Sequence, residues 1–219
     1  MILEDLIKRF PLDSAEKRIC INGNEVPESF KTIAQSILSG HFEIKEGHEV
    51  VRKVYPTCVE IYYHEESNDE DAIKDYIVYH RKKDHKNPGL FRSGSLNTHQ
   101  SGIDITFEHK ICENTVRASA LIRKYIMVDN RYENESPLTI ENNKVDDRST
   151  YLYEALFADL SIIKGFSIQW VDGEGAKEMT EPTYRKNVLL YNKDTHQKDK
   201  NSKHDGRCWQ FSVKKHNNG

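Results

Sequence analysis

A single carboxylate, Glu60, lies within the apolar and aromatic stretch VEIYY. A carboxylate in such surroundings tends to be desolvated, which raises its pKa and suits it to act as a general acid or base. Because side chains alternate along a strand, Cys58, Glu60 and Tyr62 are expected to share one face. The alternative is that this face points to solvent and that Glu60 has no chemical role.

A second group of charged residues lies within residues 94–125. Apolar and polar residues alternate from Ile103 to Phe107, which predicts a strand with one buried and one polar face. Residues 117–123 are small and apolar between two arginines, which indicates a second, more buried strand. If these strands pair antiparallel, Asp104, Glu108 and Arg123 could lie close together. A structural ion pair is the favoured interpretation of these residues taken alone.

Length and composition favour one folded domain over residues 1–219. The chain is 37% hydrophobic, 31% charged and 10% aromatic, which is typical of a folded protein with a polar surface. No apolar run approaches the roughly 18 residues that span a bilayer, and the N-terminus has no signal-peptide core. We therefore expect a cytoplasmic protein without membrane contact, and we favour a monomer.

The cysteines and histidines show no metal-binding or nucleophile motif. The four cysteines are scattered without CxxC spacing, which predicts free thiols. A metal hydrolase would need ligands at compact spacing, and no such spacing occurs among the ten histidines, which include His64, His80, His85, His99 and His109. No glycine-rich loop suited to cradle a phosphate is present. We expect neither a metal nor a cofactor.

The charge of the chain is unevenly distributed. The net charge of −3 argues against a tight, non-specific nucleic-acid binder, which would usually be basic. Residues 184–215 are nevertheless rich in lysine and arginine, whereas residues 65–75 are acidic. The basic segment could meet phosphate while the acidic segment lies elsewhere. The alternative is that both are ordinary solvated surface.

Hydrophobic periodicity predicts the order of the elements. Apolar residues at helical spacing predict helices at 2–10, 27–39 and 149–160, and an Asn-Gly pair predicts a tight connection within 19–26. A polar, turn-rich segment over 126–147 predicts a surface loop or insertion. Short strands that follow one another without alternating helices favour an antiparallel α+β domain. The strands are expected at 41–45, 49–66, 76–81, 103–107, 117–123, 166–171, 188–191 and 208–213.

The order of these segments resembles the methylpurine-DNA glycosylase family of base-excision enzymes. Residues 30–66 are similar to the family's entry helix, a hairpin and the strand with its Thr-Glu-Ala-Tyr-Leu motif, where this chain has VEIYY. RASALIRKY resembles the strand that ends in Leu-Leu-Arg, RSTYLYEALF the capped helix, and GRCWQFSV the closing strand. The resemblance implies the curved, barrel-like antiparallel fold that the family shares with the C-terminal domain of formyltransferases.

The resemblance also implies roles for individual residues. Glu60 matches the general base that activates water against the glycosidic carbon of a flipped nucleotide, and Tyr62 matches an aromatic residue that stacks on the extruded base. Arg123 matches an arginine beside the site. Such chemistry needs a pocket with a stacking face and a placed carboxylate. The implied substrate is a damaged purine in DNA or a smaller nucleoside-like molecule.

The chain departs from the family where a tyrosine-rich strand is expected. Thr98 and Ser101 stand near the positions of the tyrosines that stack on the base and wedge into the DNA. Without a wedge, extrusion from duplex DNA loses an energetic support of roughly a few kcal/mol. His99 is a candidate to stack or hydrogen-bond in their place. The family's histidine after the acidic loop has no clear counterpart, with His80 and His85 as candidates by proximity.

Two functions therefore remain open. A glycosylase-like hydrolase would hold its site residues in one concave pocket. A catalytically inactive relative that binds nucleic acid or a small ligand would instead hold Glu60 in a fixed ion pair. The residues in question are Glu60, Tyr62, His99, Asp104 and Arg123.

Overall fold

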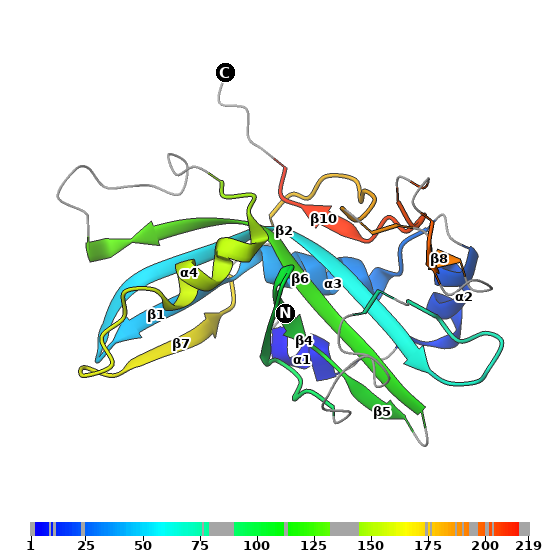
Figure 1. Cartoon of the computed structure of the whole chain (residues 1–219), viewed down its shortest axis with the longest axis horizontal. Coiled ribbons are helices and arrows are strands. Elements are labelled where there is room, and N and C mark those ends of the chain that lie inside the picture. Colours follow the sequence, from blue (N-terminus) through cyan, green and yellow to red (C-terminus); the bar gives the residue numbers. More distant parts are fainter. Residues whose placement is uncertain are drawn as a thin grey trace.

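Two long antiparallel strands form the spine of the fold in a computed structural model of the protein (Figure 1). They are β2 (Glu49–Glu66) and β6 (Asn114–Asp129), and a bulge interrupts their register between Pro56 and Val59. Runs of β-branched and aromatic residues explain why both strands are long. The structure describes all residues except 1–2, 9, 11, 23–24, 76, 79–89, 112–113, 132–144, 174, 176, 187, 190, 193–196, 200–201, 203 and 215–219.

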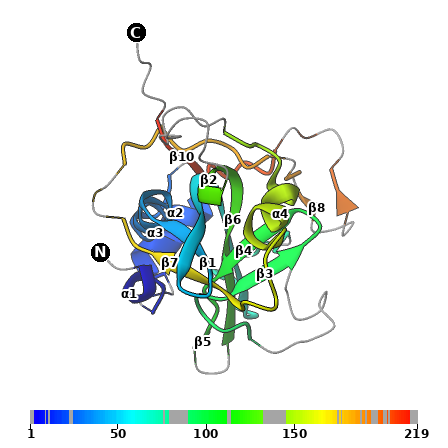
Figure 2. The same cartoon turned by 90° about the vertical axis from the view of Figure 1, so that its left-hand side faces the viewer.

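The remaining strands pair around this spine. They form one eight-stranded sheet in the order β3-β4-β6-β2-β1-β7, in which β5 pairs with β6 and β10 pairs with β2, all antiparallel. The sheet curls into a half-barrel (Figure 2). A separate two-stranded sheet joins β8 to β9. The bounds are β1 (His41–Glu46), β3 (Leu96–His99), β4 (Gly102–Thr106), β5 (His109–Ile111), β7 (Phe166–Val171), β8 (Tyr191–Asn192), β9 (Gln197–Lys198) and β10 (Gln210–Ser212).

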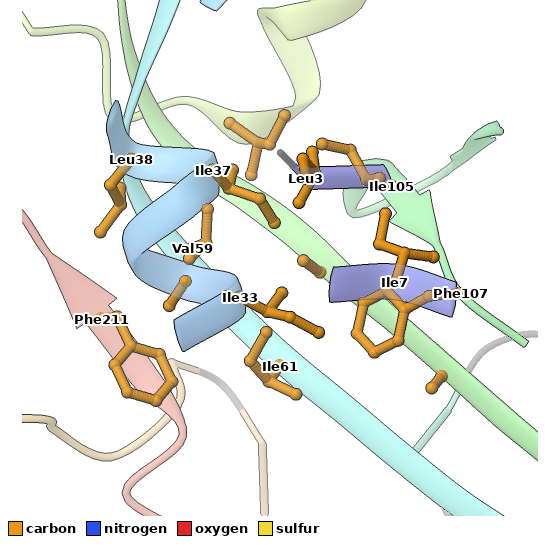
Figure 3. Close-up of a cluster of buried hydrophobic side chains, with 14 of the residues drawn as sticks. Leu3, Ile7, Ile33, Ile37, Leu38, Val59, Ile61, Ile105, Phe107 and Phe211 are labelled. Atoms are coloured by element: carbon orange, nitrogen blue, oxygen red, sulfur yellow. The ribbon is translucent and has the colours of Figure 1, made fainter. Parts of the chain in front are cut away.

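The helices cover the apolar side of the curled sheet or its ends. They are α1 (Leu3–Lys8), α2 (Ser14–Asn22), α3 (Glu28–Ser39), a 3₁₀ helix (Ser149–Tyr151) and α4 (Leu152–Phe157). Ile33, Ile37 and Leu38 of α3 pack toward β2 (Figure 3). Burial of each such side chain contributes about 1.5–3 kcal/mol, so α3 anchors the core. Within the described residues no helix is long and apolar enough to cross a membrane.

The α+β antiparallel fold predicted from the sequence is confirmed, as are most of its elements. The predicted helices at 2–10 and 27–39 correspond to α1 and α3. The strands expected at 41–45 and 49–66 are β1 and β2, and that expected at 166–171 is β7. The spacing of apolar residues, helical in some segments and alternating in others, identified each of these segments correctly.

Four local predictions are corrected. Residues 19–22 belong to α2 rather than to a turn, and Ile77 and Val78 are not in a strand. Residues 126–129 continue β6, so the expected surface segment 126–147 begins as strand, and its residues 132–144 lie outside the described ones. Residues 188–189 are not in a strand. His80 and His85 also lie outside the described residues.

The close approach of Gly40 to β7 gives a first prediction. A Cβ atom added at Gly40 would lie 2.3 Å from Trp170 Cζ2 and 2.7 Å from the Val171 carbonyl oxygen. Gly40→Ala should therefore lower the free energy of unfolding by about 1–3 kcal/mol, because overpacking forces neighbouring atoms to move. Urea denaturation measures this change.

Gly175→Ala is the matched control, because nothing lies within 4 Å of a Cβ atom added there. Its unfolding free energy should stay within about 0.5 kcal/mol of the wild-type value. Equal stability of the two alanine variants would contradict the packing of Gly40 against β7.

Candidate active site

The spine strand β2 has one apolar face and one polar face, and both are buried. Val59 and Ile61 belong to the hydrophobic core that includes α3, whereas Glu60, Tyr62 and His64 alternate with them on the other face. Glu60 is 0% exposed. The interpretation of Glu60 as a solvent-side residue is therefore wrong, because the polar face of β2 is covered by other parts of the chain.

The polar face continues across the neighbouring strands. Strand register places Glu60 opposite Leu121, Leu121 opposite Asp104, and Asp104 opposite Asn97. Residues that lie opposite one another in a sheet share a face, so these four form one row. β4, predicted to have one buried face and one polar face, is buried on both. The row thus crosses β3, β4, β6 and β2, and its two carboxylates, Asp104 and Glu60, lie on either side of Leu121.

Glu60 is held by one ion pair and two hydrogen bonds. Arg123 Nε lies 2.7 Å from Glu60 Oε2 as an ion pair, and the Tyr62 hydroxyl donates to the same oxygen at 2.9 Å. The backbone N–H of Lys186 donates to Glu60 Oε1 at 2.6 Å. A carboxylate has about four acceptor positions, so these contacts leave one position on Oε1.

The electrostatics of the two side-chain donors agree with this geometry. Burial alone would lower the pKa of Arg123, but the adjacent Glu60 carboxylate raises this pKa above its usual value. Burial, reinforced by Glu60, raises the pKa of Tyr62 well above its usual value. Arg123 is therefore a cation and Tyr62 a protonated hydroxyl at neutral pH. Arg123 also donates through Nη2 to the Lys186 carbonyl oxygen at 3.0 Å, so both backbone polar groups of Lys186 are bound at the site.

The residues predicted from the sequence form two groups. Glu60, Tyr62 and Arg123 are in direct contact. His99 and Asp104 form a second pair, with 3.1 Å between His99 Nε2 and Asp104 Oδ2, on the far side of Leu121 in the row. The three residues implied by the resemblance and the His99–Asp104 pair thus share one face of the sheet, but the two groups are not in contact.

The expected association of Asp104, Glu108 and Arg123 does not occur as one cluster. Arg123 pairs with Glu60, and Glu108 Oε2 lies 2.9 Å from Arg117 Nη1. The reason is geometric: Glu108 lies four residues beyond Asp104, so the two carboxylates meet different positions of β6. The expectation that a buried arginine needs a carboxylate is nevertheless met by both arginines.

Two further segments cover the polar face, and sequence patterns did not identify their role. Val78 and Val188 pack with Tyr62 and Leu121 in a small apolar cluster. The Arg185 guanidinium lies over the Tyr62 ring, 4.6 Å from its centroid. Since Arg185 directly precedes Lys186, the segment that covers Tyr62 is the one whose amide binds Glu60.

A buried ion cluster joins the two covering segments. Arg185 Nη1 lies 2.6 Å from Asp75 Oδ2, and Arg185 also pairs with Asp205. Arg207 Nη1 lies 3.2 Å from Asp75 Oδ1. Burial alone would raise the pKa of Asp75, but the two arginines hold this pKa below its usual value. The acidic and basic segments expected to lie apart are therefore bound to each other through these residues.

The same cluster completes the edge of β2. Tyr63 N–H donates to Asp75 Oδ2 at 3.4 Å, and Arg185 Nη1 donates to the Ile61 carbonyl oxygen at 3.3 Å. β10 pairs with β2 only at residues 58–60, so the side chains take over where that pairing stops. The opposite signs of segments 65–75 and 184–215 were the available sequence signal for this contact.

A cavity of about 690 Å³ lies away from these residues. It opens between α1, β3, β4 and β7, and its walls include Leu3, Phe42, Ile105 and Trp170. None of the five predicted site residues lines it. Glu60 and its partners are therefore enclosed by side chains rather than exposed in this cavity.

Metal binding finds no support in the part of the chain that the structure describes. No group of three or more histidine, cysteine, aspartate or glutamate side chains there could hold a metal ion. Cys20, Cys58 and Cys208 are free thiols, as predicted, while Cys112 lies outside the described residues.

Comparisons with protein families, with characterised proteins and with solved structures each find no match.

The buried ion cluster gives a second prediction. Asp75→Asn removes the carboxylate that pairs with Arg185 and Arg207, and should lower the free energy of unfolding at pH 7 by about 3–5 kcal/mol, because it leaves buried positive charge uncompensated. Urea denaturation across pH measures the effect. Because folding lowers the pKa of Asp75, the wild-type advantage should be present at neutral pH and lost as pH falls below about 4.

Asp71→Asn is the control, since Asp71 is an exposed aspartate of the same acidic segment. It should change the unfolding free energy by less than about 0.5 kcal/mol at any of these pH values. If Asp75→Asn were as stable as Asp71→Asn at pH 7, the cluster would not hold the covering segments together.

Proposed function

We propose that the chain is a methylpurine-DNA glycosylase-like hydrolase that excises a damaged purine base from DNA, with Glu60 as general base. The observation that supports this proposal is the setting of Glu60, which is buried, paired with Arg123 and left with one acceptor position on Oε1. A carboxylate fixed in this way can bind a single water molecule in one orientation, as general-base catalysis needs.

The proposed reaction replaces the N-glycosidic bond with a bond to water. The water on Glu60 Oε1 gives one of its two protons to the carboxylate while its oxygen bonds to the anomeric carbon, where it remains as a hydroxyl group. The electron pair of the breaking carbon–nitrogen bond leaves with the purine, which is a better leaving group when alkylation has made it cationic. Arg123 and the Lys186 amide hold the carboxylate in place and are positioning groups.

A second candidate function is a binding module that has lost catalysis. Two observations favour it: Glu60 is in the fixed ion pair expected of such a module, and Arg185 covers the Tyr62 ring on which an extruded base would stack. In this function the polar face would bind a nucleic acid or a small ligand after the covering segment moves, and no bond would break.

Single-turnover release of base distinguishes the two functions and is the third prediction. The substrates are oligonucleotides that carry an alkylated or a deaminated purine, in single-stranded and duplex form. We expect release by the wild type and a rate about 10²–10⁴-fold lower for Glu60→Gln, because the amide cannot accept the proton of water. Fluorescence anisotropy should show that Glu60→Gln still binds the oligonucleotide.

Glu49→Gln, an exposed position at the other end of the same strand, is the matched control and should release base at the wild-type rate. Equal release by Glu60→Gln and wild type would contradict the role of Glu60. If the wild type and both variants bind the oligonucleotide and none of them releases base, the binding module is favoured. Neither binding nor release would contradict both functions.

A further inference from the structure

The strand β7 has an open edge that its sequence does not protect. β7 is the last strand in the sheet order and pairs with β1, so among the described residues its other edge has no partner strand (Figure 1). Proteins usually protect such an edge with lysine, proline, a bulge or a very short strand. β7 has six residues, FSIQWV, without a charge or a proline, and its pairing with β1 contains no bulge. Another strand can therefore pair along this edge.

The register with β1 shows which backbone groups of β7 point to the open edge. The Gly47 N–H donates to the Gly165 carbonyl oxygen at 3.0 Å, so these two residues form a hydrogen-bonded pair. Hydrogen-bonded and non-hydrogen-bonded pairs alternate along an antiparallel ladder, so the next residue, Phe166, is in a non-hydrogen-bonded pair, as is every second residue after it. The N–H and C=O groups of Phe166, Ile168 and Trp170 therefore point outward.

The turn before β7 exposes large apolar side chains. Ile162 is 84% exposed and Ile163 is 95% exposed, and Phe166, the first residue of β7, is 44% exposed. Single exposed apolar residues are ordinary on a protein surface, whereas contiguous ones mark interaction sites. Removal of these side chains from water would favour association with another apolar surface.

The other end of β7 borders an apolar cavity. This is the cavity of about 690 Å³ whose walls include Leu3, Phe42, Ile168 and Trp170. Asp172, the residue that follows β7, also lines it and accepts a hydrogen bond from the Leu3 N–H at 2.9 Å. One edge thus carries an exposed apolar turn at its start and an apolar cavity at its end.

We propose that two copies of this chain pair antiparallel along their β7 strands, about a two-fold axis at Ile168. This axis pairs all three outward-pointing residues, because Phe166 of one copy then faces Trp170 of the other and Ile168 faces its own copy. The two eight-stranded sheets become one continuous sheet. The inference replaces the monomer expected from the sequence, and it does not depend on the proposed function.

A second copy is the partner that this edge fits, because its two ends are complementary. Antiparallel pairing brings the turn with Ile162 and Ile163 of one copy to the cavity of the other. Lys164 and Asp172 lie four residues before and four residues after Ile168, so the pairing also brings the lysine of one copy to the aspartate of the other. The apolar turn, the cavity and both charges belong to the same chain, as a two-fold interface requires.

Sedimentation equilibrium of the full chain over a concentration series tests the proposal and is the fourth prediction. The wild type should show a monomer–dimer equilibrium. Ile163→Asp should raise the dissociation constant of the dimer about 30-fold or more, because it places a charge in the partner's apolar cavity. Lys164→Glu should raise it about three- to tenfold, because the glutamate would then face the partner's Asp172. Both side chains are exposed, so the melting temperature of each variant should match the wild type.

Tyr184→Asp is the matched control for a charge at an exposed apolar position. Tyr184 is 46% exposed and follows Thr183, which bridges to Gln210 of β10, away from β7 (Figure 1). Its dimer dissociation constant should stay within about twofold of the wild-type value.

Disulfide cross-linking tests the register. In the proposed dimer the two copies of residue 168 form a hydrogen-bonded pair, whose Cα atoms lie about 5.5 Å apart, a separation that a disulfide spans. Ile168→Cys should therefore give a covalent dimer on mild oxidation with copper phenanthroline. Phe166→Cys is the control, because its two copies would lie about 14 Å apart and should give no more cross-linked dimer than the native thiols of the wild type.

A monomer at every concentration would overturn the inference. A dimer that Ile163→Asp leaves unchanged would form through another surface and would also overturn it. Equal cross-linking of Ile168→Cys and Phe166→Cys would contradict the two-fold axis at Ile168.

Discussion

The burial of both faces of β2 and β6 is the constraint on which the rest of the structure depends. One face packs Val59 and Ile61 against α3, as antiparallel sheets commonly do. The other face carries charged groups, and a buried charge is strongly destabilising unless it is paired. Each buried carboxylate of β2 and β4 accordingly has a basic partner, as Glu60 has Arg123. The covering segments enclose this polar face without leaving its charges unpaired.

The ion cluster around Asp75 links the enclosure of the sheet to the geometry of the site. Arg185 binds Asp75 and the edge of β2, and the next residue, Lys186, donates its backbone N–H to Glu60 and accepts from Arg123. The same short segment therefore closes the polar face and orients the carboxylate. Arg185 lies over the Tyr62 ring, so the segment that orients Glu60 also covers one face of Tyr62.

Periodicity alone predicted the faces of the strands but not the partners of their charges. Alternation placed Glu60 and Tyr62 on one side of β2 and located α3 correctly, because these signals are local. The partner of Arg123 depends on which strands become neighbours, and Asp75 and Arg185 are separated by 110 positions, so no local pattern contains these contacts. The opposite charges of the acidic and basic segments indicated attraction, although each was expected to be surface.

The most direct measurement is a crystal structure of the ligand-free protein at a resolution that shows ordered water around Glu60. We predict a carboxylate in contact with Arg123, the Tyr62 hydroxyl and the Lys186 amide, with one water molecule on Oε1 at the remaining acceptor position. A protein group in that position, or a Glu60 side chain turned away from Arg123, would contradict the proposed role of Glu60 as the residue that binds and activates water.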